Sequence, residues 1–299
     1  MARSDFEQSY ERLLTNPGVV ALLGGIDTGK TTYCIELVRR AHERGIPSAV
    51  VDADIGQSSV GPPTTVGLKL TAGMSEINVD TLRTADALGF VGSLNPREHL
   101  LALVSATTKL VTKAREAGCD LIVVDTTSLV SGIYGQMLKY FKMDAIAPDA
   151  VVCFERGGEL EPIVGIAQRF TPADVIELEA PRELSVRSAE DRVAYRESQF
   201  AAYFTAGASR WRVKPTVFMP TLPPEFDLIR LDGLVVGMED GKGSCVGIGV
   251  LEYDSGEDIL RMVSPVTEGV KGLRLGSVRI DPAGRSKGPV SLRQLFGTE

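Results

Sequence analysis

Short runs of aliphatic and β-branched residues alternate with amphipathic stretches over the first two thirds of the chain. These runs predict buried strands at residues 18–23, 48–51, 88–91, 121–125, 150–154 and 174–178. Helical spacing predicts helices over residues 6–14, from Lys30 to about Arg44, from Asn95 to Gly118, and from Arg187 to Tyr203. Strands that alternate with helices indicate an α/β fold, with a parallel sheet sandwiched between helices. We expect this domain to span residues 1–213.

The pattern changes after Trp211. Four prolines and no periodicity mark the segment to Pro224, and short apolar runs separated by glycines follow. Residues 239–243 lie between two such runs and have the composition of a hairpin turn. The sequence therefore predicts a small C-terminal β domain over residues 214–299. In the first domain, turn-forming residues through Thr65 predict a long irregular segment after the strand at 48–51.

Composition and charge narrow the possible partners, metal sites and cellular compartment of the protein. The 299 residues are 43% apolar and 24% charged, and the net charge of −7 provides no overall basic field for nucleic acid. A nucleic-acid partner would therefore need a local basic patch. The four cysteines form no C-x-x-C pair, and two histidines argue against a zinc site. We expect core cysteines in a reducing compartment, a cytoplasmic location and no membrane partner, because no apolar run is long enough for a bilayer.

The segment Gly24–Thr31 matches the phosphate-binding pattern G-x-x-x-x-G-K-[ST], between a predicted strand and a predicted helix. In this pattern backbone N–H groups and the helix dipole bind phosphate, the lysine reaches the β- and γ-phosphates, and the threonine binds Mg²⁺. A glycine-rich turn with a surface lysine is the alternative, but it would not require the strand and the helix. The residues expected to bind the nucleotide are Gly25, Ile26, Asp27, Thr28, Gly29, Lys30, Thr31 and Thr32.

Carboxylates follow two more of the predicted strands. Asp52 and Asp54 end the strand at 48–51, and Asp125 ends the strand at 121–125. Ligands of open α/β sheets bind outside the carboxyl ends of the strands. If these strands neighbour the phosphate-loop strand, the three carboxylates converge near the γ-phosphate. One could then hold the metal and another could face a phosphoryl acceptor; solvated loop aspartates with capping roles are the alternative.

Four features of the chain together resemble the polyribonucleotide 5′-hydroxyl kinase family. They are the motif D-x-D-x-G-Q at residues 52–57, the Gly-Pro-Pro-Thr at 61–64, the phosphate loop with Asp27, and the segment 89–96. Its members act in RNA 3′-end cleavage complexes, tRNA splicing and ribosomal-RNA processing. The resemblance runs from about Gly24 to Phe204 and implies ATP- and Mg²⁺-dependent phosphorylation of the 5′-hydroxyl end of RNA or DNA. One alternative is an ATP-binding scaffold in RNA processing with weak or no catalysis. The other is a kinase for a small metabolite. No protein partner is indicated.

The resemblance also implies roles for single residues. It makes Asp52 a metal-shell group and Asp54 the group that orients the 5′-hydroxyl, with Gln57 beside the acceptor. The family closes an arginine-bearing lid over the phosphates, and Arg192 and Arg196 share one face of the last predicted helix, with Arg187 behind them. The implied catalytic residues are Lys30, Asp54, Arg192 and Arg196. A solvated basic helix face is the alternative for the arginines.

The chain departs from the family at two points. Family members carry a Thr-x-Gly-Trp clasp whose tryptophan stacks on a base, whereas this chain has Thr126, Thr127, Ser128 and Leu129 there. Thr126 and Thr127 remain candidate acceptor-binding residues, and Tyr134 or Tyr140 could replace the tryptophan. The chain also resembles a compact form without the N-terminal β domain of longer relatives. Candidate contacts to the RNA backbone are Lys109, Lys113, Lys139, Lys142, Arg210, Trp211, Arg212 and Lys214. For Trp211 a packed anchor of the linker is the alternative.

Overall fold

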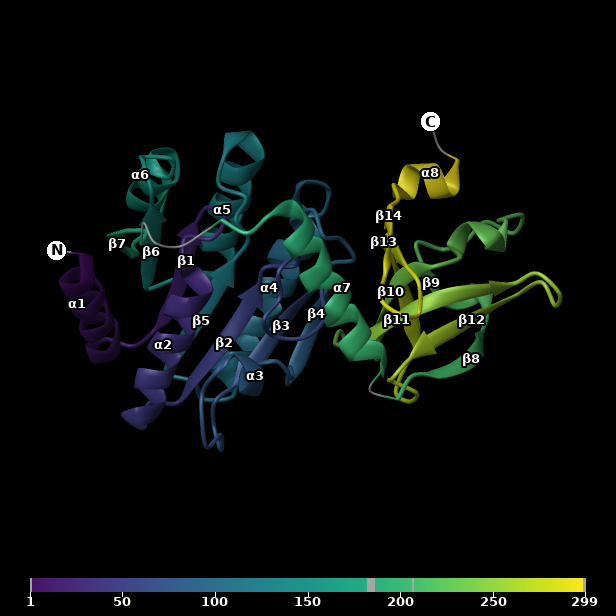
Figure 1. The fold of residues 1–299 in the computed structure, drawn as a ribbon, viewed down its shortest axis with the longest axis horizontal. Helices are drawn as coiled ribbons and strands as arrows, with labels where there is room; N and C mark the ends of the chain where they lie inside the picture. Colours follow the sequence, from purple (N-terminus) through teal and green to yellow (C-terminus); the bar gives the residue numbers. More distant parts are fainter. Residues whose placement is uncertain (1, 182–185, 206, 298–299) are drawn as a thin grey trace.

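The computed structural model describes residues 2–181, 186–205 and 207–297. Five six-residue parallel strands form one end of the sheet, in the order β2-β5-β1-β6-β7 with β7 at the edge (Figure 1). Their bounds are β1 (Val19–Gly24), β2 (Ser48–Ala53), β5 (Leu121–Thr126), β6 (Ala150–Glu155) and β7 (Asp174–Glu179). Every residue of β1, β2 and β5 is buried, because helices cover both faces of a parallel sheet. The predicted parallel sheet is confirmed, and β5 lies between β1 and β2.

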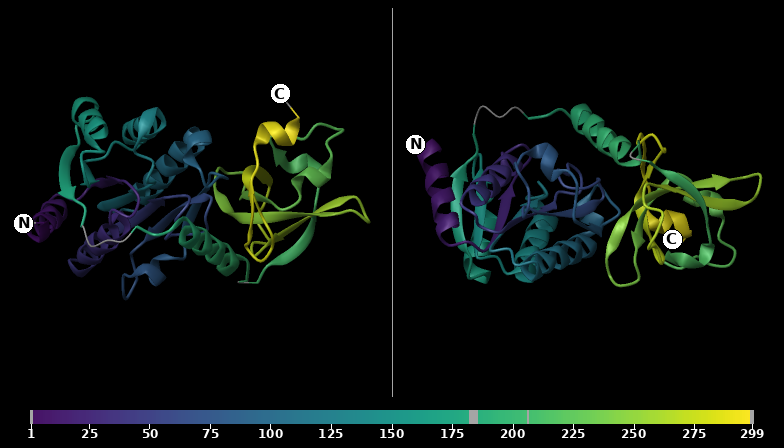
Figure 2. Two further views of the ribbon diagram at one scale, coloured as in Figure 1. Left: turned by 45° about the horizontal axis from the view of Figure 1, so that its top comes forward. Right: turned by 90° about the horizontal axis from the view of Figure 1, so that it is seen from below.

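Two layers of helices enclose this sheet (Figure 2). On one face α4 (Leu100–Glu116), α5 (Gly132–Ile146) and α6 (Glu161–Phe170) share one apolar core. On the other face α1 (Ala2–Thr15) and α2 (Lys30–Glu43) share a second core. The predicted cap at Asn95 belongs to the 3-10 helix η1 (Pro96–Glu98), and α4 starts after His99.

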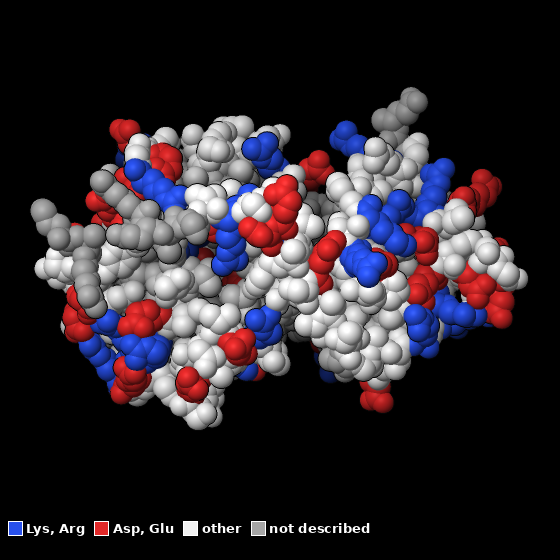
Figure 3. All heavy atoms as spheres, in the orientation of Figure 1, with Lys and Arg blue, Asp and Glu red and all other residues white. Residues whose placement is uncertain are grey.

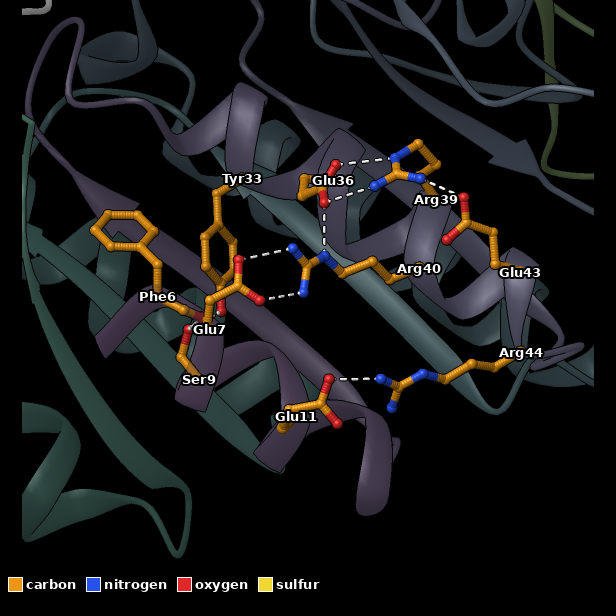
Figure 4. Close-up of polar contacts among 10 residues, drawn as sticks. All are labelled: Phe6, Glu7, Ser9, Glu11, Tyr33, Glu36, Arg39, Arg40, Glu43 and Arg44. Atoms are coloured by element: carbon orange, nitrogen blue, oxygen red, sulfur yellow. Dashed lines mark hydrogen bonds and ion pairs between the residues drawn. The ribbon is translucent and has the colours of Figure 1, made fainter. Parts of the chain in front are cut away.

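Ion pairs and aromatic rings fix α1 on α2 (Figure 4). The Arg40 guanidinium donates to both carboxylate oxygens of Glu7, at 2.6 and 2.8 Å, and lies 4.4 Å from the centre of the Tyr10 ring. The Tyr10 ring stacks on Tyr33 of α2 with 4.5 Å between centroids. Because α2 carries the phosphate loop at its N-terminus, these contacts also brace that loop.

The sheet continues beyond β2 with two antiparallel strands, β3 (Thr65–Leu70) and β4 (Ala87–Phe90), connected through α3 (Val79–Leu82). The irregular segment expected to extend through Thr65 therefore ends one residue earlier, and β3 was not predicted. Gly67 lies in the middle of β3, where a Cβ atom would come within 2.2 Å of the Val60 carbonyl oxygen. The preceding loop therefore packs directly on the strand, and only glycine permits this contact.

The C-terminal part is a β structure with its own core. It contains β8 (Ser209–Val213), β9 (Phe218–Met219), β10 (Leu234–Glu239), β11 (Cys245–Asp254), β12 (Ile259–Ser264), β13 (Gly272–Ile280) and β14 (Ser286–Pro289), with η2 (Pro215–Val217), η3 (Leu228–Leu231) and α8 (Leu292–Phe296). The predicted hairpin joins β10 and β11. The expected boundary after residue 213 falls at the end of β8, which pairs with β12, so the C-terminal sheet begins at Ser209.

The two parts meet at β4 and at α7 (Ala189–Thr205). β4 pairs with β11 through Leu88 and Cys245, so the strands form one continuous sheet. The second half of α7 buries Phe200 and Phe204 in a core with strands of the C-terminal part. Cys34, Cys153 and Cys245 are buried and Cys119 is half-buried, and no described cysteine forms a disulfide. Among the described residues, no helix has the length and apolar character needed to cross a bilayer.

Candidate functional site

A cavity of about 860 Å³ lies at the carboxyl ends of β1, β2 and β5. The phosphate loop and the first turn of α2 line one side, and the segments after β2 and β5 line others. Arginines from α3–β4 and from α7 complete it. Its lining includes residues 26–32, Asp54, Gln57, Arg83, Thr127, Leu129, Arg187, Arg192, Tyr195 and Arg196.

The phosphate loop has the backbone that its sequence requires. Gly29 has a φ of 91° and precedes α2, which begins at Lys30, so the helix N-terminus points into the cavity. Gly24 packs closely on the loop, because a Cβ atom there would come within 2.6 Å of Thr28 Oγ1. The Lys30 Nζ donates to the carbonyls of Gly24 at 3.0 Å and Gly25 at 2.7 Å. The ammonium therefore lies against the loop that it is expected to serve.

Thr31 contacts Asp125 rather than Asp52. The Thr31 hydroxyl donates to Asp125 Oδ2 at 2.5 Å, and Asp125 Oδ1 is buried with no hydrogen-bond partner among the described residues. Burial raises the pKa of Asp125, although the Lys30 ammonium and the Thr31 hydroxyl act in the opposite direction. A buried carboxylate oxygen without a partner, next to a threonine of the phosphate loop, suits a magnesium-bound water or the ion itself.

Asp52, which the resemblance makes a metal-shell group, lies beside Asp125 at the end of β2. Its carboxylate is buried outside the cavity lining and accepts hydrogen bonds from the backbone N–H groups of Asp54 at 2.9 Å, Ser59 at 2.5 Å and Val60 at 3.0 Å. The Ser59 hydroxyl adds a fourth bond at 2.9 Å. Burial, with Asp125 and Asp54 nearby, raises the pKa of Asp52 to about 7. Asp52 therefore shapes the loop that follows β2, a role that the motif spacing could not reveal.

Asp54 lines the cavity, as predicted for the residue that faces the acceptor. Its Oδ1 accepts from the backbone N–H groups of Gly56 and Gln57, both at 3.2 Å, and these bonds hold the carboxylate at the start of the turn. The Gln57 amide donates to the Arg192 carbonyl at 3.3 Å. Asp54 and Gln57 thus lie on the same cavity as Lys30, with Gln57 joined to the arginine-bearing helix.

Of the two predicted threonines at the end of β5, only one lines the cavity. Thr126 is fully buried and outside the cavity lining, with its hydroxyl bonded to the Leu22 carbonyl at 2.7 Å, so it cannot contact an acceptor. Thr127 lines the cavity, and its buried hydroxyl has no partner within the described ranges. Leu129 also lines the cavity, but Tyr134 and Tyr140 do not. The two tyrosines that could replace the missing tryptophan therefore lie outside the cavity lining.

Helix α7 brings its arginines over the phosphate loop. Asp27, with a φ of 51°, accepts from the Arg187 backbone N–H at 2.8 Å and lies 3.8 Å from the Arg192 guanidinium. Arg196 lines the same cavity, and burial, together with Arg192, lowers its pKa. Sequence reasoning missed Arg83, which lines the cavity from beyond α3, and Arg156, which donates to the Asp27 carbonyl at 2.5 Å. Neither lies in a motif, so no local signal pointed to them.

Other basic candidates lie elsewhere. Lys139 and Lys142 are buried and cannot bind an RNA backbone at the surface, whereas Lys109 and Lys113 are exposed on α4. Residues 211–214 line a separate cavity of about 280 Å³ in the C-terminal part. Figure 3 shows basic and acidic side chains interspersed over the face that it presents. On that face positive charge is not gathered into an extended patch.

Comparison with known proteins places this geometry in a family. The family model for the mRNA cleavage and polyadenylation factor CLP1 P-loop matches residues 24–206. A polyribonucleotide 5′-hydroxyl-kinase of Pyrococcus furiosus is 26% identical, covering 95% of this chain and 94% of that protein. The corresponding protein of Methanocaldococcus jannaschii is 27% identical, with 91% and 90% covered. The Clp1p chain of a Clp1p–Pcf11p complex has the same fold, with a TM-score of 0.73 at 13% identity over 93% of this chain and 79% of that one.

Proposed function

This chain belongs to the family of the mRNA cleavage and polyadenylation factor CLP1 P-loop, and from that premise we propose that it is an ATP-dependent kinase that phosphorylates the 5′-hydroxyl end of RNA. The observation that carries the proposal is the single cavity lined by Lys30, Asp54 and Arg192. Phosphoryl transfer needs a phosphate cradle, a group that orients the acceptor, and cations around the transferring group. Each requirement has a residue on this cavity.

The nucleotide would bind at residues 25–32, with the N-terminus of α2 directed at its phosphates. Lys30 would exchange its two carbonyl partners for the β- and γ-phosphates, since a charged acceptor forms the stronger bond. For Mg²⁺ we propose the Thr31 hydroxyl as a ligand and Asp125, in place of Asp52, as the carboxylate of its shell. The ion would neutralise charge on the β- and γ-phosphate oxygens.

The acceptor would enter beside the segment after β2. Asp54 would accept a hydrogen bond from the 5′-hydroxyl, whose oxygen attacks the γ-phosphorus while the bond to the β,γ-bridging oxygen breaks. The proton leaves the hydroxyl for the Asp54 carboxylate, and ADP departs. Arg192 and Arg196 would stabilise the charge on the transferring group and exclude water, because arginines aimed at developing charge act strongly in a closed site. Gln57 and Thr127 would contact the acceptor nucleotide.

Transfer of γ-labelled phosphate to oligonucleotides tests the proposal. We expect label on 5′-hydroxyl RNA and none on the same RNA carrying a 5′-phosphate, while a matching DNA strand reports sugar preference. Lys30→Ala and Asp54→Asn should abolish the label, whereas the exposed matches Lys242→Ala and Asp144→Asn should not change it. ATP binding without label on RNA or DNA would contradict the proposal and favour the scaffold. Label on nucleosides alone would favour a metabolite kinase.

The proposed setting is cytoplasmic, supported by cysteines that remain unpaired within the described residues. Expression of a tagged chain followed by fractionation tests this proposal.

A further inference from the structure

Helix α5 places its positive charges inside the protein and apolar side chains outside. Ile133, Tyr134 and Phe141 are 64%, 48% and 47% exposed, whereas Lys139 and Lys142 are 0% and 1% exposed. Lysine is almost never fully buried without a partner, because an ammonium loses its hydration there. Two such residues, three positions apart on one helix face, therefore require a reason.

Lys139 joins three elements beneath the cavity. Its Nζ donates to the Thr126 hydroxyl at 2.7 Å and to the Thr127 carbonyl at 2.5 Å. The Thr126 hydroxyl in turn donates to the Leu22 carbonyl of β1, two residues before the phosphate loop begins. The ammonium thus ties α5 to the ends of β5 and β1 and holds the backbone of Thr127, whose side chain lines the cavity.

Lys142 has no such bonds. Its Nζ is buried with no hydrogen-bond partner in the described part of the chain. Burial lowers the pKa of Lys142 to about 8, while the carboxylates Asp54, Asp52 and Asp125 act in the opposite direction. An unpartnered buried ammonium weakens a fold, so a role in stability does not account for it. Lys142 therefore differs from Lys139, whose printed contacts reach the backbone of a cavity-lining residue.

We propose that Lys139 is a positioning residue of the phosphoryl-transfer site, which fixes Thr127 for the acceptor strand. The inference rests on the proposed function and extends it to a residue that does not line the cavity.

Steady-state kinetics with Lys139→Met tests whether Lys139 positions Thr127. We expect the KM for a 5′-hydroxyl oligonucleotide to rise at least tenfold while the Kd for ATP changes less than twofold, because the phosphate loop keeps its own bonds. Thr127→Val should raise the same KM, and the double variant should add little, since both changes act through one contact. Equal losses for ATP and oligonucleotide, or full additivity, would overturn this role. If Lys139→Met does not fold, Lys139→Gln replaces it with the same expected direction.

A failure of the proposed function gives a different result. If the native chain labels no 5′-hydroxyl end, the kinase assignment fails, and binding of a fluorescent 5′-hydroxyl oligonucleotide then decides the inference. At least tenfold weaker binding by Lys139→Met would support it. Equal binding by both proteins, or binding by neither, would overturn it.

Discussion

Asp125→Asn is the substitution that tests the proposed metal position most directly. Asparagine keeps the shape of the side chain and an oxygen that can accept from the Thr31 hydroxyl, but it removes the charge. Groups that support a metal through its shell typically contribute about 10–100-fold in metal affinity, or about 1.4–2.8 kcal/mol. We expect the Mg²⁺ concentration for half-maximal phosphorylation to rise by that factor at saturating ATP. Because burial raises the pKa of Asp125, the neutral variant without ligand should be at least as stable as the native protein at pH 7.

Asp52→Asn is the matched control, since both aspartates are buried at neighbouring strand ends. The Asp52 carboxylate accepts four hydrogen bonds from its own loop, and asparagine has only one acceptor oxygen. Each buried donor left unpaired costs about 1–3 kcal/mol, so kcat should fall as the loop loosens while the Mg²⁺ requirement stays unchanged. A rise in the Mg²⁺ requirement with Asp52→Asn, and none with Asp125→Asn, would refute our reassignment and restore the role predicted for Asp52.

The remaining predictions concern pH, the lid, the missing tryptophan and the N-terminal helix. The folded state binds the Asp52 proton more tightly than the unfolded chain does. The contribution of this group to the free energy of unfolding is therefore complete below about pH 4 and is lost as pH rises to about 7. Tm measured against pH should show this slope in the native protein and not in Asp52→Asn. Asp27→Asn keeps a residue that tolerates positive φ but weakens the contacts of Asp27 with Arg187 and Arg192. Hydrogen exchange of residues 187–196 should therefore accelerate, and an unchanged rate would show that Asp27 does not hold this segment. Leu129→Trp restores an aromatic side chain to the cavity, and KM for the oligonucleotide should fall by the factor that corresponds to ~1–3 kcal/mol of base stacking. An unchanged KM would place the acceptor base elsewhere. Arg40→Ala loses partly exposed bonds to Glu7 and should cost about 1 kcal/mol, or about 2–4 °C in Tm; a loss above about 10 °C would contradict the exposed character of this pair.

The central strands and the phosphate loop were predictable because their signals are local. A β-branched run followed by the glycine pattern and a helical stretch specifies β1, the loop and α2 without reference to other segments. The position of Asp54 on the cavity followed from one strand end and the rule for open sheets.

What could not be predicted depends on contacts between distant segments. β3 carries a glycine in its middle, which weakens the strand signal, and only the packing of the Val60 carbonyl on Gly67 explains it. Asp52 and Asp125 end adjacent parallel strands in equivalent register, so their roles differ only through the loop that each one meets. Lys139 and Lys142 read as surface lysines because a helix face cannot be assigned to the interior from charge pattern alone.

The C-terminal sheet is mechanically connected to the cavity through α7. The first half of this helix carries Arg192 and Arg196 at the cavity, while its second half buries Phe200 and Phe204 against C-terminal strands. Gly284 lies so close to the helix that a Cβ atom there would come within 2.5 Å of the Ala201 backbone nitrogen. A helix held this tightly at one end can move its arginines only by bending or by carrying the sheet with it. The C-terminal part therefore fixes the second half of α7, although among the described residues it contributes no side chain to the cavity lining.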